Sequence, residues 1–107
     1  MAYFYAWETV DLKIVLEDPD RLLNYDTVCV SVSQGYRLRN AVVNVEDLDI
    51  DTGSGTIVCH LDQEDTGLFR AGIALLQVNI YYDDGERDTS EQVQIDVRDN
   101  LLKEVMS

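Results

Sequence analysis

Basic residues, proline and long apolar runs are scarce in this chain of 107 residues. Only 8 lysines and arginines oppose 21 aspartates and glutamates, which gives a formal net charge of −13. The field of such a chain repels phosphate and anionic lipid, so we expect neither a nucleic-acid partner nor a membrane partner. No apolar run approaches the ~20 residues of a membrane span. The N-terminal stretch has no basic segment followed by a long apolar one, so it predicts no secretory signal.

The acidic surplus is compatible with two interpretations. A net charge of about 2 to 8 in magnitude is typical of a well-behaved small domain, and the −13 of this chain exceeds it. Solubility and resistance to self-association are the simpler interpretation. A complementary basic partner, or bound cations, is the functional one.

Cysteine is also scarce, and the strand pattern places the two thiols apart. In residues 28–32 the valines share one face and Cys29 takes the other, whereas Cys59 shares the inward face with Ile57 and Leu61. Thiols on opposite faces do not meet the geometry of a disulfide. We therefore expect two free thiols, as in a chain that folds in a reducing cytosol.

Short stretches of alternating apolar residues fill the chain, and each predicts a half-buried strand. The stretches are Val10–Leu16, Tyr25–Ser33, about Tyr36–Val45, Leu48–Ile50, Thr56–Leu61, Ala74–Tyr82 and about Ser90–Val97. Gln34-Gly35 predicts a turn, and the irregular pattern near Arg39-Asn40 predicts a bulge or a break in the strand. Asp84-Gly85 is a strong hairpin signal. In the last strand we expect Val93 to face inward together with Ile95 and Val97.

One helical turn is expected between the strands at 56–61 and 74–82. Asp62 is a suitable N-cap residue, acidic residues follow it in the first turn, and Gly67 ends the turn. The turn should fold Leu68 and Phe69 onto the core. Six or seven short strands without a long helix predict a single antiparallel sandwich or barrel.

Alternate aspartates at Asp47, Asp49 and Asp51 resemble the start of a calcium loop. An EF-hand needs glycine at the sixth position and glutamate at the twelfth, where this chain has Thr52 and Val58. On a strand the three aspartates would line the solvent face, with the apolar residues between them facing inward. A looser calcium site is the alternative, and it would be shared with Asp83, Asp84 or Asp88.

No group of residues has the spacing of a catalytic site. His60 is the only histidine, and because it follows Cys59 on a strand the two side chains point to opposite faces, which disfavours a Cys–His dyad or shared zinc. The stretch 52–55 lacks the lysine of a phosphate-binding loop. We therefore predict no catalytic residue, no metal and no cofactor, and we do not expect an enzyme.

The stretch from Leu61 to Val97 has the most distinctive order in the chain. It begins Leu-Asp-Gln-Glu-Asp-Thr-Gly-Leu-Phe, passes through Ala71-Gly72 into a strand with an internal glutamine, Gln77, and continues through an Asp-Gly hairpin into the last strand. With this order the chain resembles a family of small Ig-like β-sandwich modules of tailed phages and prophages, mostly of Gram-positive hosts. It is similar to the N-terminal domain of upper baseplate proteins, and related modules are stand-alone head- or tail-associated virion proteins.

The resemblance covers nearly the whole chain and implies a fold and a role. The implied fold is an all-β, antiparallel Ig-like β-sandwich of about seven strands with one short helical turn, in one domain over residues 1–107. The residues themselves, rather than the resemblance, suggest an aromatic N-terminal arm over residues 1–8 and a C-terminal tail over residues 98–107, since the aromatic N-terminus is not a fixed feature of the family. The implied role is that of a structural protein of the virion, made in the host cytoplasm, whose partners are other virion subunits and further copies of itself.

Large apolar side chains at both ends of the chain are candidates for docking, because tyrosine and tryptophan are frequent interface anchors. The N-terminal aromatics alternate, which also fits a half-buried first strand. The docking residues that we predict are Tyr3, Phe4, Tyr5, Trp7, Leu101, Leu102 and Val105. The alternative function is a carbohydrate-binding or adhesin-type module whose exposed aromatics stack on sugar rings. Its candidate residues are Trp7, Tyr36, Tyr81 and Tyr82.

Overall fold

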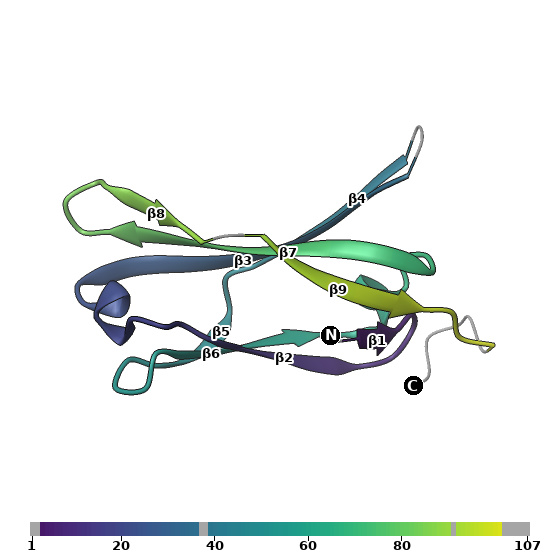
Figure 1. Ribbon diagram of the computed structural model, residues 1–107, viewed down its shortest axis with the longest axis horizontal. Helices are drawn as coiled ribbons and strands as arrows, with labels where there is room; N and C mark the ends of the chain where they lie inside the picture. Colours follow the sequence, from purple (N-terminus) through teal and green to yellow (C-terminus); the bar gives the residue numbers. More distant parts are fainter. Residues whose placement is uncertain (1–2, 37–38, 91, 102–107) are drawn as a thin grey trace.

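The protein folds as two β-sheets that face each other, as the computed structural model shows (Figure 1). The structure describes residues 3–36, 39–90 and 92–101. The large sheet has the order β1-β9-β7-β3-β4, with β8 also paired to β7, and the small sheet has the order β2-β6-β5. None of the helices in this described part of the chain is long and apolar enough to cross a membrane.

The strands are short except for two long central ones. The large sheet contains β1 (Tyr3–Tyr5), β3 (Tyr25–Tyr36), β4 (Arg39–Val45), β7 (Gly72–Tyr82), β8 (Arg87–Thr89) and β9 (Val93–Arg98). The small sheet contains β2 (Val10–Val15), β5 (Leu48–Asp51) and β6 (Thr56–Leu61). A 3₁₀ turn at Pro19–Leu22 and a helical turn, α1 (Gln63–Thr66), complete the described elements. The predicted all-β sandwich is confirmed, with nine strands rather than about seven in the described residues.

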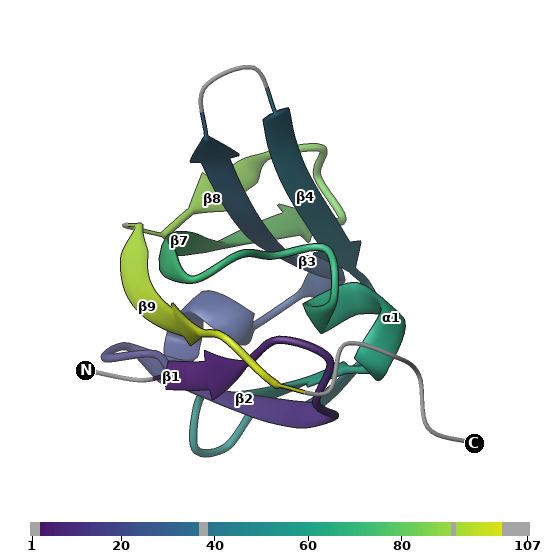
Figure 2. The same ribbon diagram turned by 90° about the vertical axis from the view of Figure 1, so that its right-hand side faces the viewer.

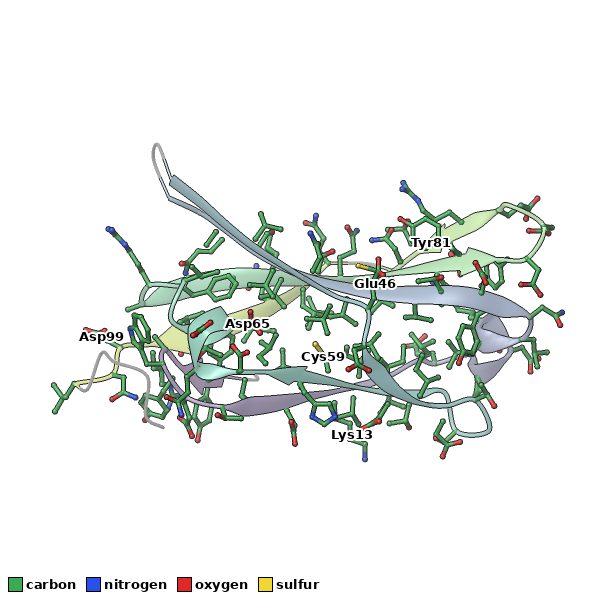
Figure 3. All side chains as sticks on the ribbon, turned by 180° about the vertical axis from the view of Figure 1, so that it is seen from behind. Lys13, Glu46, Cys59, Asp65, Tyr81 and Asp99 are labelled. Carbon is green, nitrogen blue, oxygen red and sulfur yellow. The ribbon has the colours of Figure 1, made fainter. Side chains whose placement is uncertain are left out.

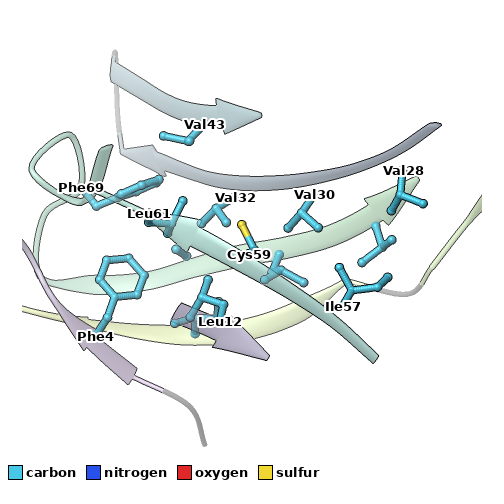
Figure 4. Packing of buried hydrophobic residues seen from close by; sticks show 14 of the residues in the cluster. Phe4, Leu12, Val28, Val30, Val32, Val43, Ile57, Cys59, Leu61 and Phe69 are labelled. Atoms are coloured by element: carbon cyan, nitrogen blue, oxygen red, sulfur yellow. The ribbon is translucent and has the colours of Figure 1, made fainter. Parts of the chain in front are cut away.

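The core lies between the sheets and follows the predicted alternation (Figure 4). Val28, Val30 and Val32 of β3 point toward the small sheet and are 2% exposed or less. Cys59 of β6 faces them and is fully buried, whereas Cys29 lies on the other face of β3 and is half-buried. Both thiols are free, as predicted. Burial raises the pKa of Cys59 to about 11, so this thiol stays protonated and unreactive at neutral pH.

One prediction about the middle of the chain is wrong, and another is only partly right. Gln34-Gly35 does not turn, because β3 continues to Tyr36. The Gln34 side chain is buried, and its amide donates to the Arg70 carbonyl and accepts from the Arg70 N–H, both at 2.8 Å, so a polar residue is satisfied inside the strand. The predicted bulge near Arg39-Asn40 does not occur, since the β3–β4 register runs without a shift along its described length. The break that was the alternative is present, because β3 ends at Tyr36 and β4 begins at Arg39.

The last predicted strand, about Ser90–Val97, corresponds to β9, and a short strand that was not predicted, β8, precedes it. β7 pairs with both β8 and β9. The segment that faces β7 has one extra residue between the Asn79–Thr89 pair and the Leu76–Val93 pair, so the register shifts there by one residue. Ser90 lies at this step, where its hydroxyl accepts from the Val78 N–H at 2.9 Å. Val93 lies opposite the buried Leu76 and therefore on the inward face, as predicted, but it stays 53% exposed there.

The helical turn α1 forms as the sequence predicts. Asp62 caps it, with its carboxylate accepting from the Asp65 N–H at 2.9 Å and the Asp65 carboxylate accepting in return from the Asp62 N–H. Phe69 is buried after the turn, but Leu68 is 57% exposed, so only one of the two expected residues reaches the core.

The N-terminal residues form a strand of the sandwich rather than a free arm. β1 pairs with β9 in the parallel direction, which corrects the expectation of a fully antiparallel fold. Figures 1 and 2 both show β1 between β9 and β2, at one open side of the sandwich. Phe4 is 2% exposed, and its ring meets the ring of Phe69 edge-to-face at 5.9 Å. Phe4 is therefore a core residue in this fold.

Replacing Phe4 by alanine should lower the free energy of unfolding by about 3 to 5 kcal/mol, the usual cost of removing a buried phenylalanine. The matched change Tyr3→Ala, on the solvent side of the same strand, should cost no more than about 1 kcal/mol. Urea denaturation followed by circular dichroism measures both. Equal stability of the Phe4 variant and the wild type would show that β1 is not part of the core.

Candidate partner-docking site

Two tyrosines and an arginine form a cluster on the solvent side of β1 and β9. Because Phe4 faces inward, strand alternation turns Tyr3 and Tyr5 outward, and the parallel register places Tyr5 opposite Arg98. The two tyrosine rings meet edge-to-face at 6.0 Å, and the Arg98 guanidinium lies 3.7 Å from the centre of the Tyr3 ring. We call Tyr3, Tyr5 and Arg98 the tyrosine–arginine cluster.

The cluster is held in place and is accessible. Arg98 forms a hydrogen bond with Tyr5 and donates another to Asp96 at 3.4 Å. Both hydrogen bonds raise the pKa of Arg98, and the bond with Tyr5 contributes most. Tyr3 is 51% exposed and Tyr5 is 38% exposed. Tyrosine and arginine are over-represented among residues that dominate binding energy at interfaces. The cluster therefore combines the residue types of interface anchors with an accessible position.

Trp7 plays a different part at the same end of the molecule. It is half-buried, and its backbone takes a positive φ of 65° as the chain leaves β1. The ring packs so closely on Gly67 that a Cβ there would lie 2.6 Å from it, so this contact requires glycine. A hollow of about 510 Å³ opens beside it, lined by Ala6, Trp7, Gly67, Phe69, Arg70, Ala71 and Asp99.

The predicted docking residues at the C-terminal end are only partly described. Leu101 is fully exposed just beyond β9. Leu102 and Val105 lie outside the described residues, so their docking role stays a prediction.

A second surface, an apolar groove beside β2, was not foreseen from the sequence. It has a volume of about 470 Å³ and runs between the two sheets. Its lining residues are Tyr3, Val10, Asp11, Leu12, Lys13, Ile14, Val15, Leu76, Val93 and Ile95. The alternation places Val93 on the inward face, but the sequence does not show that Val93 stays 53% exposed there.

His60 connects three strands on the outer face of the small sheet. Its Nδ1 lies 2.5 Å from an oxygen of Asp11 on β2, and its Nε2 lies 2.7 Å from an oxygen of Asp49 on β5. The hydrogen bonds to Asp49 and Asp11 both raise the pKa of His60, and the bond to Asp49 contributes more. Among the residues that the structure describes, no group of three histidine, cysteine or acidic side chains is placed to hold a metal ion. The predicted solvent-facing position of Asp49 and Asp51 is confirmed.

Of the aromatic residues named for sugar binding, those whose side chains the structure describes do not share one groove. Trp7 packs on Gly67 beside α1, whereas Tyr81 is exposed on the outer face of the large sheet (Figure 3). Tyr82 points to the other face, where its hydroxyl donates to the Arg21 carbonyl at 2.6 Å. The side chain of Tyr36 lies outside the described part of the structure.

Comparison with known proteins gives no family. No model of a protein family and no curated protein sequence matches the chain. Among solved structures, the chain is similar to a proposed glycoside hydrolase from Bacteroides vulgatus ATCC 8482, with a TM-score of 0.46 and 12% identity over 94% of this chain. The chain spans 17% of the length of that protein. A likeness of this size assigns no activity.

The single histidine makes the His60 bridge directly measurable. Its folded-state pKa lies above the ordinary 6.5, so the charged ring stabilises the fold. That stabilisation is fully present below about pH 6.5 and is lost as the pH rises through the folded-state value. In an NMR titration, Asp49→Asn should lower the pKa more than Asp11→Asn. An unshifted titration in the wild type would show that the bridge does not form in solution.

Proposed function

We propose that this protein is a non-catalytic structural subunit of a tailed-phage virion that binds neighbouring subunits through the tyrosine–arginine cluster. The resemblance over residues 61–97 supports the virion role. The features that carried the resemblance, namely the capped turn α1, the strand β7 and the Asp-Gly hairpin, occupy adjacent positions in one sandwich. The role requires binding surfaces and no turnover.

The tyrosine–arginine cluster is the observation that carries the proposal. A docking surface works best when its anchors are already ordered, because less conformational entropy is lost on binding. Tyr3 and Tyr5 are fixed by the β1–β9 pairing, by contact with each other and by Arg98. Arg98 is also one of only 8 basic residues in a chain with 21 acidic ones, so the cluster differs in chemistry from most of the surface.

The carbohydrate alternative has less support from the geometry. Sugar-binding aromatics should converge on one groove, but Trp7 and Tyr81 lie on different surfaces. Tyr81 also lies near an arginine, since the Arg87 guanidinium is 6.0 Å from the centre of its ring. This pair therefore has the same residue types as the tyrosine–arginine cluster. This makes Tyr81 a useful control.

The double change Tyr3→Ala and Tyr5→Ala should reduce incorporation of the protein into particles by more than tenfold. Truncating one interface anchor costs about 2 kcal/mol or more, and each 1.4 kcal/mol is a factor of ten. The assay expresses the variant in cells that produce the phage lacking the wild-type copy. Quantitative mass spectrometry then counts the protein in purified particles.

Tyr81→Ala is the matched control and should incorporate normally, since Tyr81 is as exposed as Tyr5 (39% against 38%) but lies outside the cluster. Thermal melts of all variants must show folded protein. Normal incorporation of the double variant would reject the cluster as the docking site. Absence of the wild-type protein from particles would reject the virion role.

A further inference from the structure

β2 is an open edge of the small sheet. It pairs with β6 on one side, and no other described strand pairs with it on the opposite side. An exposed edge presents unpaired backbone N–H and C=O groups and is a template for another strand. The apolar groove runs beside this edge, and Val15 at its end is 63% exposed. The edge is therefore suited to strand addition.

The charges on β2 are arranged symmetrically about Leu12. Leu12 is buried, and its neighbours Asp11 and Lys13 both point to solvent on the outer face. Figure 3 shows Lys13 directed away from the sandwich. Opposed residues in an antiparallel pair lie on the same face. A two-fold axis at Leu12 would therefore place Asp11 of each copy opposite Lys13 of the other.

We propose that two copies of this chain associate edge to edge, with β2 pairing antiparallel to β2 about a two-fold axis at Leu12. The small sheets then join into one six-stranded sheet of order β5-β6-β2-β2-β6-β5. Two Asp11–Lys13 pairs form on the outer face. On the inner face, Val10 of each copy lies opposite Ile14 of the other. Such an interface is isologous, since the same surface is used by both copies.

The charges also select this register against its neighbour. Moving the axis by one residue keeps the faces but changes the pairing: an axis at Lys13 would set Lys13 against itself, and an axis at Asp11 would set Asp11 against itself. Opposite charges across two strands stabilise the pair and like charges destabilise it. The register centred on Leu12 is the one that satisfies both the inward apolar residues and the outward charges.

Both charged groups are available for the contact. Lys13 forms no ion pair with any described residue. Asp11 reaches His60 through Oδ1, and its side chain is 63% exposed. The second carboxylate oxygen can therefore accept from Lys13 of the other copy while the bridge to His60 is kept.

The net charge of −13 opposes association of two copies. The opposition is limited, because charges farther apart than about 8 Å are largely screened at physiological salt. At the edge itself one aspartate faces one lysine, so the local charge is balanced. The two-fold axis also brings the apolar residues Val10, Leu12 and Ile14 of the two copies together on the inner face.

The inference does not depend on the virion role, and it is tested on the purified full chain. Analytical ultracentrifugation should show a dimer for the wild type. D11K leaves only lysines at the two outer positions, and K13D leaves only aspartates. Each variant alone should dimerise at least tenfold more weakly, because both cross-strand pairs become repulsive. An equimolar mixture of D11K and K13D should form heterodimers, since every pair is then opposite in charge.

Two further proteins make the test specific. The double variant D11K/K13D keeps the composition and exchanges the charges, so it should dimerise like the wild type. Arg70→Asp changes the net charge as K13D does but lies outside β2, so its dimer should not weaken comparably. A monomeric wild type would overturn the proposal. Two other results would also overturn it. One is a mixture that stays monomeric although each variant has the thermal stability of the wild type. The other is a dimer weakened equally by K13D and by Arg70→Asp.

Discussion

The register of β7 is the constraint on which the rest of the structure depends. β7 pairs with β3 along one edge, and with β8 and β9 along the other. Its inward residues Ala74, Leu76, Val78 and Ile80 are at most 4% exposed. A slip of one residue would turn all of them to solvent. Because β9 takes its register from β7, and β1 from β9, this alternation also positions the tyrosine–arginine cluster.

Period-two alternation let the sequence predict the sandwich and the free thiols, and the capping preference of Asp62 predicted the turn α1. These patterns failed where a tertiary contact decides the local structure. Gln34-Gly35 reads as a turn, but Arg70 provides the hydrogen bonds that keep Gln34 inside a strand. The bridge from His60 to Asp11 and Asp49 joins residues far apart in the chain, so only the strand pairing could reveal it.

The N-terminal aromatics serve the fold and the surface at once. Alternation sends Phe4 to the core, where it packs on Phe69, and leaves Tyr3 and Tyr5 outside. The two interpretations offered by the sequence, a half-buried strand and a docking segment, are thus compatible. A docking surface built on a paired strand is rigid, and rigidity lowers the entropic cost of binding. β2 also combines a core face with a surface role. Its inward apolar residues alternate with Asp11 and Lys13, the charges on which the proposed pairing of two copies depends.

The central claim is that the face carrying Tyr3 and Tyr5 is covered when the protein is in its assembly. Hydroxyl-radical footprinting, read by mass spectrometry, measures the reactivity of each tyrosine in the isolated protein and in purified particles. The account predicts that Tyr3 and Tyr5 lose reactivity in the particle while Tyr81 keeps its own. Unchanged reactivity of Tyr3 and Tyr5 in particles that contain the protein would contradict it.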